Sequence, residues 1–340
     1  MTVSRKSKRS NPISASKVLK RSHISALLVT NLINIRYLSG LKVSVGYGLI
    51  TSSGITVFVD DRYVENARKS ALPGVRVVHS EELKKHLLRL RSCAVEGETL
   101  TLSEWNKLRK KYPKVRWKES VNAIEFWRRS KSEHELKSIM TACKITKTML
   151  AKVPKLLQLG VSEKEIAWKL CAMAHELGAE GMAFETIVGF GTNTASPHHR
   201  PTDRTFIPGD LVQVDVGVHY NGYCSDYSRV YFTADPTPEQ KKAHTSLLRV
   251  KNAVTKLVAP GVTVSALDRF ARRELEKDGY EKEFCHALGH GVGLEIHEGV
   301  VLTKRMPKTA LLQNEVITIE PGLYFPGKWG MRIEDTVIVR

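Results

Sequence analysis

Acidic residues are missing from the start of this 340-residue chain, whose first fifty positions contain no aspartate or glutamate. Residues 1–129 hold 26 Lys and Arg against 10 Asp and Glu, whereas the remainder is almost neutral. Such a basic module is typical of binding to nucleic acid or an anionic surface. Because we find no aromatic-interleaved nucleic-acid motif there, we expect instead a charged accessory domain behind a disordered basic tail at residues 1–14, with no nucleic-acid partner.

Cysteine and long apolar runs are also scarce. The five cysteines are scattered, odd in number and without CxxC spacing, which predicts unpaired thiols in a reducing compartment, the cytoplasm. No apolar run approaches the roughly 18 residues that a membrane span needs, so no membrane association is expected. The basic N-terminus lacks the apolar core of a secretory signal, and an organellar transit peptide is the alternative to a simple tail.

The pattern of apolar and polar residues changes near residue 129. Before it, strand-like apolar runs alternate with helical patterns, which predicts a smaller α/β domain over residues 15–129. The predicted strands are 26–30, 47–52, 55–61 and 75–80, and the predicted helices are 61–71 and 81–91. A chain of this length, 42% hydrophobic, can bury enough surface for a second domain, which we place at residues 130–340.

Helix starts and one internal repeat organise the second domain. Capping boxes predict helices after Ser132 and Ser162, and Thr237-Pro238 predicts a third. The pattern Gly-Val-Ser/Thr at 160–162, closed by a glycine at 178, recurs 101 residues later at 261–263 and 279. Histidines follow each copy, at 198–199 and at 286–297. The repeat therefore predicts a duplicated half-domain with a site between the halves.

A hairpin in the first half carries two aspartates. Residues 211–232 alternate apolar and polar side chains around Asn221-Gly222, the strongest short hairpin signal. A two-residue turn puts Asp215 and Asp226 on one face as diagonal neighbours. Two ionised carboxylates in one site require protons, cationic partners or metal ions. A solvent-facing pair on an edge hairpin is the alternative that these residues alone leave open.

Two predicted apolar strands near the end of the chain favour a metal site over a solvent-facing pair of aspartates. One ends in Glu320, and the other, residues 330–339, carries Arg332 and Glu334 on one face. Buried glutamates are costly without a partner. His290, between two glycines, and His297 complete a set of oxygen and nitrogen donors suited to two divalent cations. The oxygen-rich set favours Mn²⁺, with Co²⁺, Zn²⁺ or Fe²⁺ as alternatives.

Five sequence blocks carry a resemblance to a known family. They are SPHHRPTDR, GDLVQVDVGVHYNGYCSDYSR, HALGHGVGLEIHE, ITIEPGLY and GMRIEDT. Across residues 15–340 the chain resembles the pita-bread metallopeptidases, in the branch of Xaa-Pro peptidases, which comprises aminopeptidase P and prolidase. The resemblance implies an α+β chain: a pita-bread (creatinase/aminopeptidase) catalytic domain with pseudo-twofold halves, preceded by a creatinase-type α/β domain.

The resemblance also implies roles for particular residues. Position by position, the family's metal ligands fall on Asp215, Asp226, His290, Glu320 and Glu334. Asp226 and Glu334 would bridge both metals, Asp215 would bind one, and His290 and Glu320 the other. The catalytic residues implied are His198, His297 and Glu320, the last also as proton shuttle, and His286 and Arg332 are implied to contact substrate.

The function implied is hydrolysis of Xaa-Pro bonds in di- or oligopeptides by a metal-bridging hydroxide, in a homodimer. Within the same chemistry the alternative is a methionine aminopeptidase, which usually lacks the N-terminal domain. A creatinase would lack the ligands. The alternative of another class is a non-catalytic pita-bread binding protein. Three features depart from the family pattern: His199 stands where Gly is common, family members usually continue beyond the position of Arg340, and the basic tail is not a family feature.

Overall fold

A computed structural model describes residues 13–340. The predicted tail at residues 1–14 therefore lies outside the described residues, except for Ile13, which is buried, and Ser14, which precedes the first helix. The chain divides into two compact units, the first ending at Arg128 and the second spanning Arg129–Arg340. Each unit is described by itself below.

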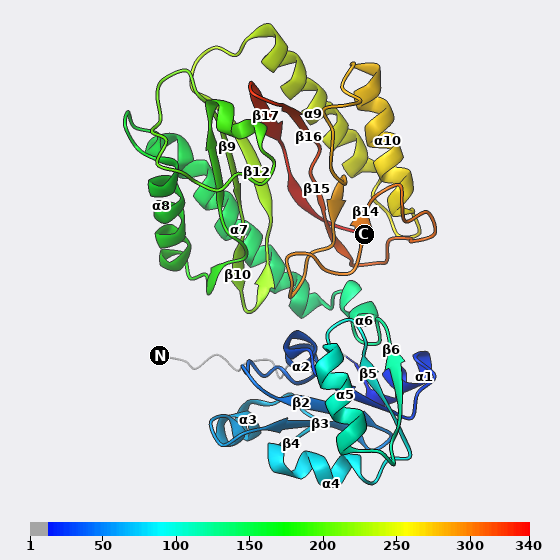
Figure 1. Ribbon diagram of the computed structural model, residues 1–340. Helices are drawn as coiled ribbons and strands as arrows, with labels where there is room; N and C mark the ends of the chain where they lie inside the picture. The colour runs from blue at the N-terminus through cyan, green and yellow to red at the C-terminus, as the bar shows by residue number, and fades with distance from the viewer. Residues whose placement is uncertain (1–12) are drawn as a thin grey trace. The chain divides into compact units, whose positions relative to one another are not determined.

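The first unit is a mixed sheet with helices around it (Figure 1). Its helices are α1 (Ala15–Arg21), α2 (Leu32–Ser39), α3 (Val64–Ser70), η1 (Ser80–Glu82), α4 (Leu83–Leu87), α5 (Leu102–Lys111) and α6 (Glu125–Arg129). Its strands are β1 (Ala26–Val29), β2 (Tyr47–Thr51), β3 (Gly54–Val59), β4 (Val75–His79), β5 (Ser92–Glu96) and β6 (Arg116–Ser120). They lie in the order β4-β3-β2-β1-β5-β6, and the four predicted strands form one contiguous side of the sheet.

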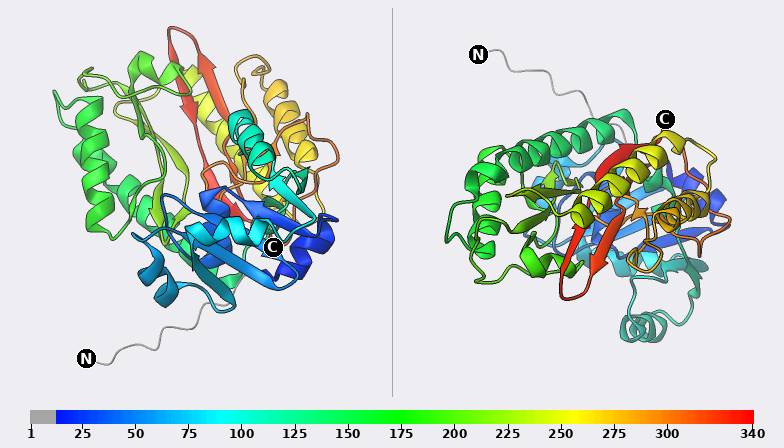
Figure 2. Two further views of the ribbon diagram at one scale, coloured as in Figure 1. Left: turned by 60° about the horizontal axis from the view of Figure 1, so that its bottom comes forward. Right: turned by 90° about the horizontal axis from the view of Figure 1, so that it is seen from above.

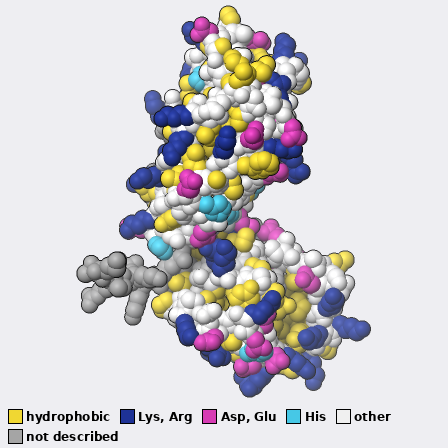
Figure 3. All heavy atoms as spheres, turned by 90° about the vertical axis from the view of Figure 1, so that its left-hand side faces the viewer, with side chains coloured by type: hydrophobic (Ala, Val, Ile, Leu, Met, Phe, Trp, Pro, Cys, Tyr) yellow, Lys and Arg dark blue, Asp and Glu magenta, His cyan; other side chains and the backbone are white. Residues whose placement is uncertain are grey.

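Basic side chains of the first unit do not gather in one place on the face that Figure 3 draws. Lys and Arg are spread there among acidic, hydrophobic and uncharged side chains of the described residues. On this face the described part of the first unit shows no continuous basic patch, and the absence of a nucleic-acid partner stays a prediction.

The second unit contains four helices of at least three turns and a set of short strands. The helices are α7 (Glu133–Leu156), α8 (Glu163–Glu176), η2 (Gly191–Ala195), α9 (Pro238–Leu257) and α10 (Val264–Lys277). The strands are β7 (Gly181–Met182), β8 (Ile187–Phe190), β9 (Leu211–Val216), β10 (Val218–Tyr220), β11 (Tyr223–Cys224), β12 (Tyr227–Phe232), β13 (Gly289–His290), β14 (Val301–Leu302), β15 (Val316–Ile319), β16 (Gly322–Phe325), β17 (Trp329–Arg332) and β18 (Asp335–Ile338). Figures 1 and 2 show α7 and α9 behind these strands, on the same side.

The predicted duplication is visible in the helix pairs. Helix α8 follows α7 in the first half and α10 follows α9 in the second, and α10 begins 101 residues after α8. The three predicted starts are confirmed, because Ser132, Ser162 and Thr237 each form a complete capping box. Each half packs its own apolar core: one cluster lies between α7, α8 and β8–β12, and another between α9, α10 and β13–β18.

Each half also contains one hairpin that is interrupted midway. The first turns at Asn221-Gly222, where both residues have positive φ, and its register pairs Asp215 with Ser228 as predicted. It breaks at Gly217, where an added Cβ would lie only 1.9 Å from the carbonyl oxygen of Ser225. Backbone this close leaves no room for a side chain, so the pleat is broken beside both aspartates.

The second hairpin was not predicted as a pair. The sequence predicted one strand over residues 330–339, but the structure divides this stretch into β17 and β18, and that prediction is wrong in this detail. The backbone N–H of Ile333 donates to Pro321 and that of Glu334 to Ser228, which draws the chain out of a single ladder. The pairs β15–β18 and β16–β17 share one register, which places Glu320 across from Glu334 at the break.

None of the helices in the described part of the chain combines the length and apolar character needed to cross a bilayer. No disulfide joins any of the cysteines, all of which lie within residues 13–340.

Candidate metal centre

The two interrupted hairpins supply acidic side chains to one cavity of about 490 Å³ in the second unit. Asp226 lies between β11 and β12, Glu320 between β15 and β16, and Glu334 between β17 and β18. Asp215 lies in β9 and His290 in β13. All five predicted ligands line this cavity, as do His198, His286, His297 and Arg332. The structure thus brings together every site residue that the sequence predicted.

His290 is oriented with one ring nitrogen toward the carboxylates. Its Nδ1 donates a hydrogen bond to the carbonyl oxygen of Gly291 at 3.1 Å, and its Nε2 points toward the carboxylates. Nε2 lies 3.4 Å from Oδ2 of Asp226 and 3.6 Å from Oε1 of Glu320. Ligand atoms of Asp226, His290 and Glu334 all lie within 4.8 Å of one another. This spacing is that of donors around a common cation.

The carboxylates of this cavity are buried close together, and the described residues offer them too few hydrogen-bond donors. Burial and the nearby Asp215 and Glu320 carboxylates raise the pKa of Asp226 well above its usual value. Burial, together with Asp226 and Glu320, does the same to the pKa of Glu334. Among the described residues, none donates a hydrogen bond to Oδ1 of Asp215, Oδ1 of Asp226 or Oε1 of Glu334.

Buried anionic oxygens without partners are costly, and divalent cations satisfy them directly. A donor set of four carboxylates and one imidazole suits hard or borderline divalent metals. The residues present therefore fit a pair of such ions.

Arg332 is the cation that the protein itself supplies to this site. Its Nη2 donates to Oδ2 of Asp215 at 2.5 Å and its Nε to Oγ of Ser228 at 2.9 Å. Its Nη1 donates to the Tyr324 hydroxyl at 2.5 Å and to the carbonyl of Pro197 at 3.1 Å. Four of the five guanidinium N–H groups are thus engaged within the protein. Arg332 is held rigidly against Asp215.

The two adjacent histidines of the first half have separate environments. Nε2 of His199 lies 2.8 Å from Oε2 of Glu163, a fully buried carboxylate at the start of α8. Glu163 also accepts from the backbone of Phe190, the amide of Asn193 and both donors of Thr202. His198 has an exposed side chain that lines the cavity. His199 therefore anchors the loop, and His198 is the one available to a ligand.

His286 and His297 lie on the other side of the cavity. The His286 ring donates from Nδ1 to the carbonyl of Ala287 at 2.7 Å, and its Nε2 has no partner among the described residues. Burial, with Arg332 nearby, lowers the pKa of His286 to about 4. The His297 ring stands edge-on to that of His290, with centroids 4.3 Å apart, and burial lowers its pKa as well. Both rings are therefore neutral at pH 7.

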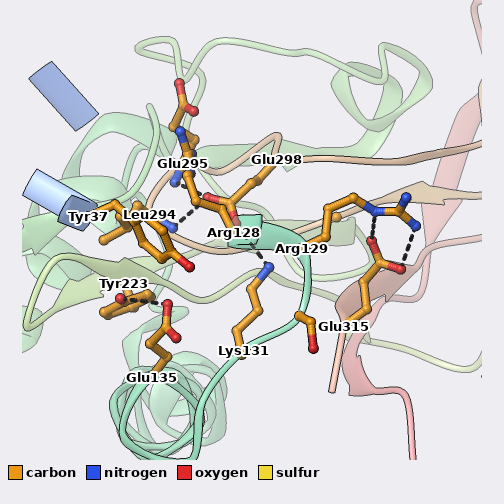
Figure 4. A network of polar contacts seen from close by, with 12 residues as sticks. Tyr37, Arg128, Arg129, Lys131, Glu135, Tyr223, Leu294, Glu295, Glu298 and Glu315 are labelled. Atoms are coloured by element: carbon orange, nitrogen blue, oxygen red, sulfur yellow. Dashed lines mark hydrogen bonds and ion pairs between the residues drawn. The ribbon is translucent and has the colours of Figure 1, made fainter. Parts of the chain in front are cut away.

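A buried ion pair holds the loop that carries His297 (Figure 4). Nζ of Lys131 lies 2.9 Å from Oε1 of Glu298, and both side chains are almost fully buried. Oε2 of Glu298 accepts from the backbone N–H of Leu294 at 2.9 Å. A Cβ on Gly293 would lie 2.1 Å from Oε1 of Glu298, so only glycine lets the loop wrap around this carboxylate. Lys131 and Glu298 thus fix the residue next to His297.

Sequence reasoning missed these supporting residues. Glu163 is a first-turn acid of a helix and Lys131 directly precedes a capping box, and charges at such positions are commonly exposed to solvent. The one usable signal was Glu298, an acid in a stretch otherwise rich in glycine and apolar residues. The pairing of Glu320 with Glu334 had a further signal, the turn at Pro326-Gly327, where Gly327 has φ of 74°.

The fold and this cavity define a duplicated α+β protein with a shared acidic metal centre. Comparison with known proteins then assigns the chain. Residues 137–340 match the model of Metallopeptidase family M24, and residues 14–129 match the Creatinase/Prolidase N-terminal domain. The chain belongs to metallopeptidase family M24, whose members depend on divalent metal ions.

Individual relatives cover nearly the whole chain. An Xaa-Pro dipeptidase of Pyrococcus horikoshii is 34% identical over 94% of this chain and 92% of its own length. The solved Xaa-Pro dipeptidase from Bacillus anthracis has a TM-score of 0.92 and 30% identity over 96% of this chain and 93% of its own. An X-Pro aminopeptidase from Thermotoga maritima has a TM-score of 0.86 and 32% identity, covering 95% of each chain. These matches favour the Xaa-Pro peptidase interpretation over a methionine aminopeptidase or a binding protein.

Proposed function

We propose that the chain hydrolyses Xaa-Pro peptide bonds with two divalent metal ions, most suitably Mn²⁺, held by Asp215, Asp226, His290, Glu320 and Glu334. The observation that carries the proposal is the set of three buried carboxylate oxygens that accept no hydrogen bond from the described residues, in a cavity that His290 also lines. When bound, the two ions would lower the pKa of a water molecule between them, so that hydroxide is available near neutral pH.

The chain's own residues would handle substrate and protons. The reaction adds the oxygen of water to the scissile carbonyl carbon, breaks the C–N bond and returns a proton to the proline nitrogen. Glu320 is suited to carry that proton, because its carboxyl group lines the cavity in which the substrate would bind. His198 and His297 line the cavity from its two halves, and each could donate a hydrogen bond to the developing oxyanion.

Specificity for proline would come from the cavity wall. Besides the polar groups, Phe184, Ile187, Ile296 and Val301 line the same cavity. A proline nitrogen carries no N–H after acylation, so the leaving residue is recognised by the shape of its ring rather than by an amide donor. Apolar side chains beside the acidic floor supply such a surface, and Nε2 of His286, which has no partner among the described residues, supplies an acceptor next to it.

Further assignments accompany this proposal. Residues 130–340 would be the catalytic domain and residues 15–129 the creatinase-type N-terminal domain. The family resemblance supports a homodimer. Cysteines without disulfides support work in a reducing compartment, the cytoplasm.

The test is hydrolysis of Ala-Pro and Ala-Pro-Ala by protein loaded with Mn²⁺. We expect turnover of at least one substrate, and a fall in kcat/KM of about 10³-fold or more in Asp226→Asn, because one ligand and one charge are lost. Asp203→Asn is the matched control, since Asp203 is an exposed surface acid paired with Lys164. If wild-type protein carrying metal hydrolyses neither peptide, the proposed function is wrong.

A further inference from the structure

The cavity is lined by two arginines with opposite environments. Arg332 is 4% exposed and most of its donors are engaged, as described above. Arg200 follows the cavity histidine His198 by two residues, and its side chain is 82% exposed. An exposed cation such as Arg200 can change partners when a ligand arrives, whereas the hydrogen bonds of Arg332 are already used to hold the fold.

The partner that Arg200 has in the structure is a weak one. Its Nε lies 3.2 Å from Oε2 of Glu185, whose side chain is 65% exposed. Glu185 lines the same cavity, just before β8. Ion pairs between such exposed side chains contribute little to stability, because water solvates both charges nearly as well. A second carboxylate can therefore replace Glu185 at little cost.

We propose that Arg200 is a specificity-determining residue that binds the C-terminal carboxylate of an Xaa-Pro dipeptide, exchanging Glu185 for it. The inference rests on the proposed function. In a dipeptide the carboxylate stands on the proline ring, one carbon from the scissile nitrogen, whereas a longer peptide has an uncharged amide there. In the proposed function two divalent ions offset the four acidic side chains of the site, so the carboxylate on the proline ring is best held by a cation of the cavity wall that is not already committed.

The exchange makes Glu185 a competitor of the substrate. Removing Glu185 leaves Arg200 without its carboxylate, so a dipeptide should bind more tightly. Removing Arg200 takes away this cation and leaves the substrate carboxylate beside Glu185, so the dipeptide should bind more weakly. Substitutions at the two residues should thus have opposite effects on the KM for a dipeptide, and the effect of Glu185 should depend on the presence of Arg200.

The experiment compares Ala-Pro with Ala-Pro-amide, which differ only in the charge at the C-terminus. We expect Arg200→Gln to raise the KM for Ala-Pro about tenfold while its kcat, and both constants for Ala-Pro-amide, stay within about twofold. Arg200→Lys should be intermediate, because it keeps the charge and loses the planar fork. Glu185→Gln should lower the KM for Ala-Pro about two- to threefold, and this gain should vanish in the double variant.

Lys164→Gln is the matched control, because Lys164 is also exposed, paired with an exposed acid and outside the cavity. It removes the same charge and should leave the preference for Ala-Pro over Ala-Pro-amide unchanged. Equal changes for the two substrates in Arg200→Gln, or none, would overturn the inference and leave the proposed function standing. Hydrolysis of neither substrate by the wild-type protein would overturn both.

Discussion

The two halves of the second unit repeat one backbone plan but supply different chemistry to the shared cavity. The first half offers two aspartates on a single hairpin, where Asp215 pairs with Ser228 and Asp226 follows the break. The second half places Glu320 directly across from Glu334 and adds His290 from another strand. The comparison teaches that the duplicated element is the interrupted hairpin, whose break turns acidic side chains out of the ladder, while the identity of each donor is free to differ.

The loops that carry the cavity histidines are likewise fixed in different ways. In the first half, buried Glu163 gathers neutral donors and His199. In the second, buried Glu298 is paired with the ammonium group of Lys131. A carboxylate surrounded by several hydrogen-bond donors and a carboxylate paired with one buried charge respond differently to substitution. The predictions below use that difference.

The largest effects are expected at the histidines of the two loops. His198→Ala and His297→Ala should each lower kcat about 10²- to 10³-fold, because each removes one donor to the developing oxyanion under the proposed function. Steady-state hydrolysis of Ala-Pro measures both. His199→Gln is the control for its neighbour and should lower kcat less than tenfold. A variant at 199 that loses more activity than the one at 198 would reverse the roles assigned to this pair.

Loss of the buried charge pair should have the largest effect on stability. Lys131→Met removes the ammonium group that lies 2.9 Å from the buried Glu298 carboxylate, which costs about 3–5 kcal/mol of unfolding free energy. Urea denaturation of the metal-free protein measures this. The double variant Lys131→Met with Glu298→Gln should recover part of the loss, because it removes the carboxylate charge as well. No recovery would mean that the lysine stabilises the loop through packing rather than charge.

Glu163→Gln tests the other anchor and should cost less, about 1–3 kcal/mol, because an amide still accepts some of the hydrogen bonds. Burial raises the pKa of Glu163, but hydrogen bonds from His199 and Thr202 outweigh it, and the pKa is lowered overall. A lowered pKa stabilises the folded protein above the carboxyl's ordinary value and loses that contribution in acid. The deficit of the variant should therefore be full above about pH 5 and shrink below it. Denaturation at pH 4 and pH 7 distinguishes this from a deficit independent of pH.

The smallest effect on stability is expected at the two helix starts that are equivalent in the two halves. Ser162 forms a capping box at α8, whereas Thr263, at the equivalent position of α10, makes no side-chain cap bond. Ser162→Ala should cost about 1 kcal/mol, and Thr263→Ala should cost clearly less. Thermal unfolding of the two variants side by side measures the difference. Equal losses would show that the cap bond at α8 is not what stabilises that helix.

The sequence predicted features that depend on neighbouring residues better than contacts between residues far apart along the chain. Caps, the 101-residue repeat and the Asn221-Gly222 hairpin are local signals, and the structure confirms them. The arrangement of the second half was harder, because Glu320 and Glu334 meet through strands that were each interpreted separately, and one predicted strand proved to be two. Buried charges such as Lys131 and Glu163 could not be predicted, since their partners lie 167 and 36 residues away.

The central claim is that both halves together build one site for two divalent ions. Calorimetric titration of metal-free protein with Mn²⁺, checked by elemental analysis, tests it directly without reference to any substrate. We predict two ions per wild-type chain and fewer than two in both Asp226→Asn, from the first half, and Glu334→Gln, from the second. A wild-type chain that takes up one ion or none, or a variant of either half that keeps both ions with unchanged affinity, would contradict the account.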